Sequence, residues 1–148
     1  MKEKDMYWVF RQSFDYLYRQ EHKSHYFKFS DMNLIQEAFD SYCLYDWTFF
    51  WIEYKLNKNK NMFCFKSIFN WSEHQIKWLS HIKECWWKWI VIIKFEETKK
   101  IYWYDINFVN NNYESNIKVW EGHELKKIKD EIWRYIYDIK PMLNYGRF

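Results

Sequence analysis

Apolar positions near the start of the chain recur at the spacing of an amphipathic helix, and polar residues fill the positions between them. The residues of this apolar stripe are Met6, Phe10, Ser13 or Phe14, and Leu17. The pattern predicts a helix over residues 5–20 that buries the stripe against a core. Residues 25–29 alternate over a shorter stretch and predict a strand, whereas the spacing over residues 30–39 suits either a strand or a helix.

A hairpin is the clearest prediction for the next part of the chain. Residues 45–48 have the composition of a turn, and residues 49–56 are a run of aromatic and branched side chains. Such a run favours a strand, which we expect to be the outgoing arm of the hairpin. Residues 58–61 then predict a polar loop, residues 62–65 a short edge strand, and Ser72 the start of a helix.

The second half of the chain predicts two strands and a closing helix. Residues 87–95 are nearly all apolar in their centre, which is typical of a strand covered on both faces, and residues 101–105 alternate. An apolar stripe predicts a helix over residues 121–139 that Pro141 stops, and its members are Leu125, Ile128, Ile132, Ile136 and Ile139. The order of elements predicts an α/β fold, a mixed β-sheet flanked by helices, in a single domain over residues 1–148.

Composition excludes several classes of protein. The longest apolar run, residues 89–93, is far shorter than the ~20 residues of a membrane-spanning helix, and the first residues lack the apolar stretch of a signal peptide. We therefore expect a cytoplasmic protein without a membrane partner. The two glycines, Gly122 and Gly146, form no glycine-rich loop, so we expect no nucleotide cofactor. The three cysteines form no CxxC pair and predict free thiols.

Aromatic residues make up 25% of the chain, including 11 tryptophans. So many rings predict an exposed aromatic surface that could anchor a partner or stack on bases, although drift in the base composition of the gene would also explain them. The net charge is only +3, but residues 54–72 contain four lysines and no acid. This stretch is therefore a candidate for binding phosphates.

The residues that best suggest chemistry lie in the predicted strand of the hairpin. Side chains two positions apart share a face of a strand, so Glu53 and Lys55 should point together while Tyr54 points to the other side. A second carboxylate beside Glu53 could complete a site for a hard divalent cation, with Lys55 orienting the attacking water. Asp40 and Asp46 are the candidates, and we favour Asp40 because the incoming arm would carry it back beside Glu53.

Asp40 followed by Glu53-x-Lys55 resembles the pattern of the PD-(D/E)xK nuclease superfamily. Residues 35–106 also resemble the RecU-type Holliday-junction resolvases, which have a Glu-x-Lys strand, a lysine-rich loop, an EHQI helix start and a hydrophobic strand in this order. The resemblance implies a restriction-endonuclease-like fold, a homodimer, and cleavage of branched DNA in recombination and repair with Mg²⁺, or Mn²⁺ as the alternative ion. It also implies a nucleoid-associated location. The family has a longer segment before its catalytic aspartate, a stalk that is short or missing in this chain.

Carried over by position, the resemblance makes Asp40 and Glu53 metal ligands, together with the carbonyl of Tyr54, and makes Lys55 the catalytic lysine. Gln75 matches a glutamine of the family's site, although Ser72-x-x-Gln75 is equally well explained as a capping box. Three lysines are candidates for binding DNA, or else belong to an ordinary solvated loop: Lys58, Lys60 and Lys66. The alternative function is a catalytically inactive nuclease fold that binds DNA or protein.

Overall fold

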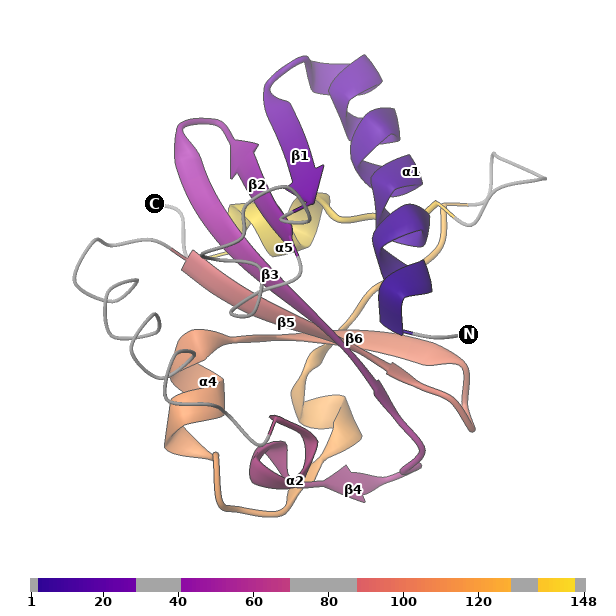
Figure 1. Ribbon diagram of the computed structural model, residues 1–148, viewed down its shortest axis with the longest axis vertical. Helices are drawn as coiled ribbons and strands as arrows, with labels where there is room; N and C mark the ends of the chain where they lie inside the picture. Colours follow the sequence, from indigo (N-terminus) through magenta and orange to yellow (C-terminus); the bar gives the residue numbers. More distant parts are fainter. Residues whose placement is uncertain (1–2, 29–40, 70–87, 129–135, 146–148) are drawn as a thin grey trace.

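The computed structural model describes residues 3–28, 41–69, 88–128 and 136–145 (Figure 1). Its main sheet has six strands in the order β1-β2-β3-β5-β6-β8. The strands are β1 (Ser24–Lys28), β2 (Ser41–Tyr45), β3 (Thr48–Asn57), β5 (Lys88–Phe95), β6 (Lys100–Asp105) and β8 (His123–Glu124). Only β3 and β5 pair in parallel, and the other neighbours are antiparallel. The predicted α/β class with a mixed sheet flanked by helices is confirmed.

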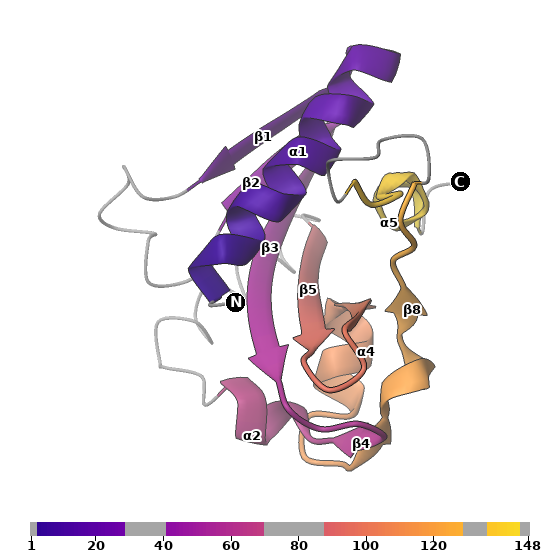
Figure 2. The ribbon, with the colours of Figure 1, turned by 90° about the vertical axis from the view of Figure 1, so that its right-hand side faces the viewer.

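Helices and a small second sheet surround the main sheet. The long helix α1 (Glu3–Glu21) lies alongside β1, β2 and β3 (Figure 2). The second sheet pairs β4 (Met62–Phe63) with β7 (Ile117–Lys118). The other helices among the described residues are α2 (Phe65–Phe69), α4 (Ile106–Asn111), the 3₁₀ helix η2 (Val119–Glu121) and α5 (Lys140–Asn144). No helix in the described part of the chain is long and apolar enough to cross a membrane.

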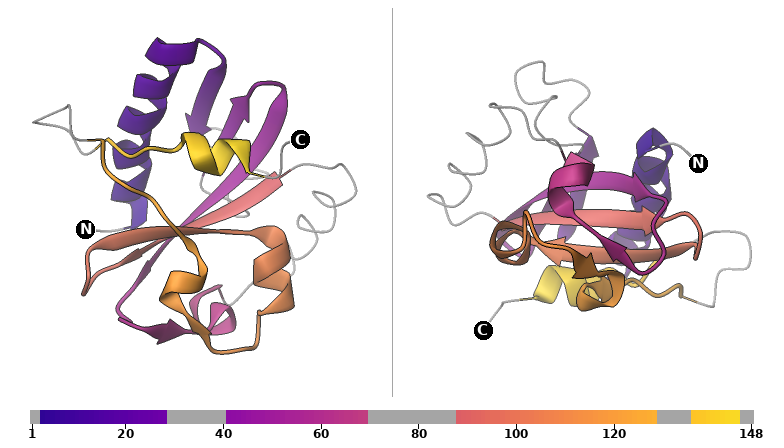
Figure 3. Two further views of the ribbon diagram at one scale, coloured as in Figure 1. Left: turned by 180° about the vertical axis from the view of Figure 1, so that it is seen from behind. Right: turned by 90° about the horizontal axis from the view of Figure 1, so that it is seen from below.

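The two faces of the sheet carry separate hydrophobic clusters because side chains alternate along each strand. One face, which we call the α1 face, holds Phe50, Ile52 and Tyr54 of β3 and packs against α1 and the segment that ends in α5. The other, the α2 face, holds Trp51 of β3 and packs against α2, α4 and the β4–β7 pair. Figure 3 shows α2 and α4 together at the end of the molecule opposite α1 and α5.

Most of the predicted elements are confirmed. The apolar stripe of α1 is buried along its length, and the turn at residues 45–48 connects β2 to β3 as expected. β5 is an inner strand whose side chains are buried on both faces, as its continuous apolar sequence indicates. The edge strand predicted for residues 62–65 ends at Phe63, because Phe65 already begins α2. Residues 30–39 and the predicted helix start at Ser72 lie outside the described residues.

The helix predicted over residues 121–139 is wrong for the part that the structure describes. The main-chain N–H of Leu125 donates to the carbonyl of Ile101 on β6, at 2.8 Å, and the N–H of Ile128 donates to Ile136, at 2.8 Å. Tertiary hydrogen bonds thus replace helical ones, while Leu125 and Ile136 are still buried against the α1 face. Pro141 does not stop a helix but lies in the first turn of α5, where its missing N–H costs nothing.

Candidate functional site

Glu53 is the one charged side chain that the structure describes as buried, with 6% of its surface exposed. It lies in the second half of β3, on the α2 face, between Trp51 and Lys55. Its neighbours in register on β5 are apolar: Val91 lies opposite Glu53, and Ile93 lies opposite Lys55. A carboxylate in such surroundings loses much of its hydration and therefore attracts a cation strongly.

Lys55 provides a positive charge next to the carboxylate of Glu53. Its Nζ lies 3.6 Å from Oε1 of Glu53, and only 17% of its side chain is exposed. The same Nζ lies 5.8 Å from the centre of the Phe69 ring, so α2 helps to hold the lysine over the sheet. The sequence-based prediction that Glu53 and Lys55 share a face is confirmed.

Tyr54 points to the opposite face, as predicted. Its hydroxyl forms a hydrogen bond with the hydroxyl of Tyr26 and accepts one from Ser41 Oγ at 3.5 Å. Burial raises the pKa of Tyr26 well above its ordinary value, and the neighbouring Tyr54 contributes in the same direction. The hydroxyl of Tyr54 belongs to this hydrogen-bond network on the α1 face, so the part of Tyr54 that could bind a metal beside Glu53 is its main-chain carbonyl.

Asp46 is not brought to Glu53. It lies in the two-residue turn between β2 and β3, in the left-handed region with φ of 46°, and its carboxylate is 3.7 Å from Nζ of Lys23. Thr48, which follows the turn, is five residues before Glu53, or roughly 17 Å along an extended strand. Asp40 and Gln75 lie outside the described residues. Within the described ranges, no three His, Cys, Asp or Glu side chains are close enough to hold a metal ion together.

The fold brings acids to two of the three predicted DNA-binding lysines. Lys60 Nζ is 4.0 Å from Glu97, and Lys66 Nζ is 3.2 Å from Glu114. Both pairs are exposed, so water and salt weaken them. Lys58 is exposed and forms no ion pair with any described residue. The net charge of this stretch is therefore smaller than the sequence suggests, and Lys58 is the lysine least affected.

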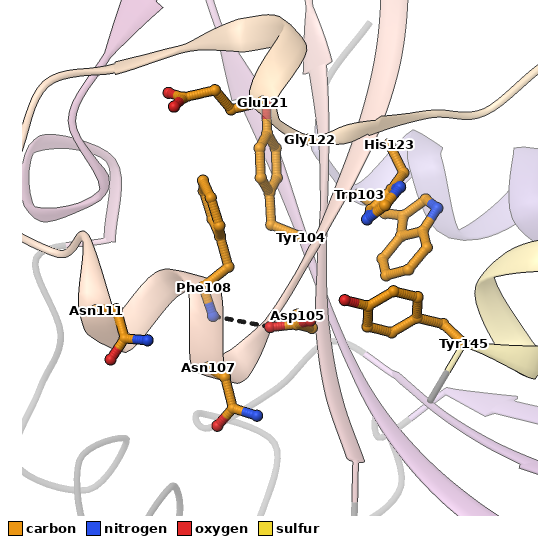
Figure 4. A pocket seen from close by; sticks show the side chains of 10 residues that line it. All are labelled: Trp103, Tyr104, Asp105, Asn107, Phe108, Asn111, Glu121, Gly122, His123 and Tyr145. Atoms are coloured by element: carbon orange, nitrogen blue, oxygen red, sulfur yellow. Dashed lines mark hydrogen bonds between the residues drawn. The ribbon is translucent and has the colours of Figure 1, made fainter. Parts of the chain in front are cut away.

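A cavity of about 340 Å³ beside β6 was not predicted from the sequence (Figure 4). Trp103, His123 and Tyr145 are in mutual ring contact on one side of it, and Asp105 lies between them and α4. Asp105 caps α4 by accepting from the N–H of Phe108 at 2.8 Å, and its negative charge raises the pKa of Tyr145. The wrong helix prediction for residues 121–139 concealed this cavity, because it placed His123 on a helix.

β5 separates this cavity from β3, so the cavity and the Glu53–Lys55 pair are different places on the sheet. Comparison with protein-family models finds no match, and comparison with curated proteins finds none either. Among the described side chains, the Glu53–Lys55 pair is the strongest candidate for a functional site.

Proposed function

We propose that this protein is a Mg²⁺-dependent DNA endonuclease. The observation that carries the proposal is the burial of Glu53 beside Lys55 on an inner strand of the sheet. A folded chain gains little stability from burying such a pair, because the cost of removing both charges from water offsets their attraction. A catalytic role explains why a charged pair occupies a position where an apolar pair would pack.

The register of the hairpin supports Asp40 as the second carboxylate. Ser41 pairs with Ile52, and side chains alternate along a strand. A strand continued by one residue before Ser41 would present Asp40 opposite Glu53 and on the same face. Asp40, Glu53 and the carbonyl of Tyr54 would then be the oxygen ligands, a set that suits Mg²⁺ and also Mn²⁺.

Each residue of the proposed site would have a distinct task in phosphodiester hydrolysis. A bound divalent ion polarises a phosphate oxygen and lowers the pKa of a bound water. Glu53 and Asp40 would hold the ion, and Lys55 would orient the attacking water. Gln75 would assist at this site, and Lys58, Lys60 and Lys66 would contact the DNA backbone without reading its sequence.

The order of elements supports the resemblance to RecU-type resolvases. The Glu-x-Lys strand β3 is followed by the lysine-containing loop at residues 58–61, and the hydrophobic strand β5 returns parallel to β3 and beside it. We therefore propose a restriction-endonuclease-like fold, with a homodimer that cuts one strand per subunit of branched DNA. The recombination and repair role and the nucleoid-associated location belong to the same proposal.

A cleavage assay tests this proposal. The purified protein is incubated with a labelled four-way junction and with a linear duplex of the same sequence, in Mg²⁺ or in EDTA. We expect cleavage only with Mg²⁺, and we expect Asp40→Asn and Glu53→Gln to lower its rate by about 10³-fold while leaving DNA binding intact. Asp46→Asn is the matched control and should cleave normally. Full cleavage by the Glu53→Gln variant would refute the proposal.

An inactive DNA-binding or protein-binding module is the second candidate. Three exposed tryptophans favour it, since rings in water are common at interfaces: Trp8, Trp47 and Trp120. In the same assay, the module predicts DNA binding without cleavage by the parent protein. Cleavage that depends on Mg²⁺ and Glu53 would exclude it.

A further inference from the structure

The fold places an exposed tryptophan beside the lysine-containing loop, although the two are far apart in the sequence. Lys118 pairs with Met62, the residue that follows this loop, and the N–H of Val119 donates to the carbonyl of Asn61 at 2.8 Å. Trp120 comes next in the chain, and 58% of its surface is exposed. The loop at residues 58–61 and the segment at residues 118–120 therefore form one surface, which we call the Trp120 surface.

Hydrogen bonds to main-chain atoms hold the segment that carries Trp120 in place. Val119 is buried, and its carbonyl accepts a hydrogen bond of 2.7 Å from the hydroxyl of Tyr104 on β6. The N–H of Lys118 donates to Glu121 Oε2 at 2.8 Å, which fixes the turn of η2. Because these contacts fix the main chain that carries Trp120, little backbone entropy is lost when a ligand binds.

The charges of the Trp120 surface suit a nucleic acid strand. Lys118 Nζ lies 5.7 Å from the centre of the Trp120 ring, and Lys58 and Lys60 lie on the neighbouring loop. Nζ of Lys60 lies 4.0 Å from Oε1 of Glu97, but this ion pair is exposed and therefore weak. Exposed aromatic rings interleaved with lysines bind single strands by stacking on bases and neutralising phosphates.

The position of this surface also suits the proposed active site. β3 runs from the turn at Asp46 toward the loop, so Glu53 and Lys55 lie in the half of the strand that leads to the Trp120 surface. The fully exposed Trp47 lies at the other end of β3, next to the pair between Asp46 and Lys23. Trp47 is therefore an even more exposed ring in a place that does not lead to Glu53.

We propose that Trp120 stacks on an unpaired nucleobase while Lys58, Lys60 and Lys118 contact the flanking phosphates. This inference rests on the proposed nuclease function and names its substrate class: DNA with a single-stranded segment next to the scissile bond. A base inside a continuous duplex is stacked on its neighbours and does not offer its face to Trp120. The protein should therefore prefer branched DNA with an unpaired arm, such as a flap, over a blunt duplex.

Binding measurements without divalent ions test the inference independently of cleavage. The affinities of the full chain for a labelled single strand and for a blunt duplex are measured by fluorescence anisotropy in EDTA over a range of salt concentrations. We expect Trp120→Ala to weaken single-strand binding roughly tenfold and duplex binding by less than about twofold. Trp47→Ala, the matched control, should change neither affinity. Lys118→Ala should weaken both and lower the single-strand salt slope by about 0.7.

A crosslinking measurement needs no variant and guards against a folding defect in Trp120→Ala. A single strand that carries 5-bromodeoxyuridine is irradiated with the parent protein, and the crosslinked peptide is identified by mass spectrometry. An adduct on the peptide that contains Trp120 supports the inference. Adducts confined to other peptides, or equal effects of Trp120→Ala and Trp47→Ala, would overturn it.

The two proposals fail in different ways. Cleavage that requires Glu53 but has no dependence on Trp120 would overturn the stacking site and leave the nuclease. Single-strand binding that depends on Trp120, with no cleavage by the parent protein in Mg²⁺, would support the stacking site and overturn the nuclease.

Discussion

The two faces of β3 differ in the kind of side chain that they bury. On the α1 face, Phe50 and Ile52 are fully buried among apolar side chains, and the polar atoms of Tyr54 are satisfied by Tyr26 and Ser41. On the α2 face, the same strand buries Glu53 with Lys55 as its partner at 3.6 Å. One strand thus presents an uncharged packing surface on one side and an ion pair on the other.

This difference indicates that the α2 face of β3, and not its α1 face, carries the energetic cost of burying a charge. Neutral hydrogen-bonded groups such as the Tyr26–Tyr54 pair are cheap to bury, whereas a carboxylate is expensive even with a partner. Substitutions on the α1 face should therefore lower stability, and substitutions of Glu53 should lower activity.

The largest effect is expected for Glu53→Gln. The cleavage rate should fall by about 10³-fold, because the neutral amide is a poor ligand for a hard cation. The free energy of unfolding should also fall, because the largely buried charge of Lys55 loses its partner. Denaturant titration and the cleavage assay measure the two quantities on the same preparation. The control is Glu97→Gln, which removes the carboxylate of an exposed ion pair. A loss of stability in Glu53→Gln without a loss of cleavage rate would contradict the assignment of the two faces.

Ile52→Ala should have the next largest effect, and it should act on stability. Ile52 is fully buried on the α1 face, and its truncation leaves a cavity. We expect the free energy of unfolding to fall by about 2–5 kcal/mol, as measured by urea titration. The rate per folded molecule should be unchanged at a temperature where the variant is folded. A rate that falls as far as that of Glu53→Gln would mean that the α1 face also contributes to chemistry.

Tyr54→Phe should have a smaller effect of the same kind. It removes a hydroxyl that is shared with Tyr26 and Ser41 and should lower the free energy of unfolding by about 1 kcal/mol. Tyr18→Phe, at an exposed ring of α1, serves as the control and should be neutral. An equal loss in the two variants would show that the buried network contributes nothing specific.

The smallest effect is expected at the edge of the α1 face, where Glu21 accepts hydrogen bonds from Lys140 and Tyr45. The hydrogen bond from Lys140, followed by that from Tyr45, lowers the pKa of Glu21. A lowered carboxyl pKa adds stability that is present at neutral pH and is lost as the pH falls through the lowered value. Glu21→Gln should therefore be slightly less stable than the parent at pH 7 and equally stable in acid. Thermal unfolding across this range measures the difference, and a constant difference would contradict the pKa assignment.

Local patterns were sufficient for the parts of the fold that depend on nearby residues. The continuous apolar sequence of β5 and the run of aromatic and branched residues in β3 predicted both strands, and the alternation of side chains along a strand placed Glu53 and Lys55 on one face. The hairpin register then shows that Asp46 lies at the turn and away from Glu53, a choice that residue types alone left open.

Long-range contacts account for what the sequence did not predict. The stripe at residues 121–139 has helical spacing, but Gly122 packs against Tyr104, where a Cβ would overlap the ring, and Leu125 bonds to Ile101. Similarly, the acids that pair with Lys60 and Lys66 come from distant parts of the chain. Trp120 was predicted only as part of a general excess of exposed rings, because its position beside the loop depends on the β4–β7 pair.

The most direct measurement of the central claim is the binding of Mn²⁺, used as a paramagnetic substitute for Mg²⁺ and followed by electron paramagnetic resonance. We expect the parent protein and Asp46→Asn to bind the ion alike, and Asp40→Asn and Glu53→Gln to bind it at least about tenfold more weakly. Equal binding by the parent and Glu53→Gln, or no binding by the parent, would contradict the assignment of Glu53 to a metal centre.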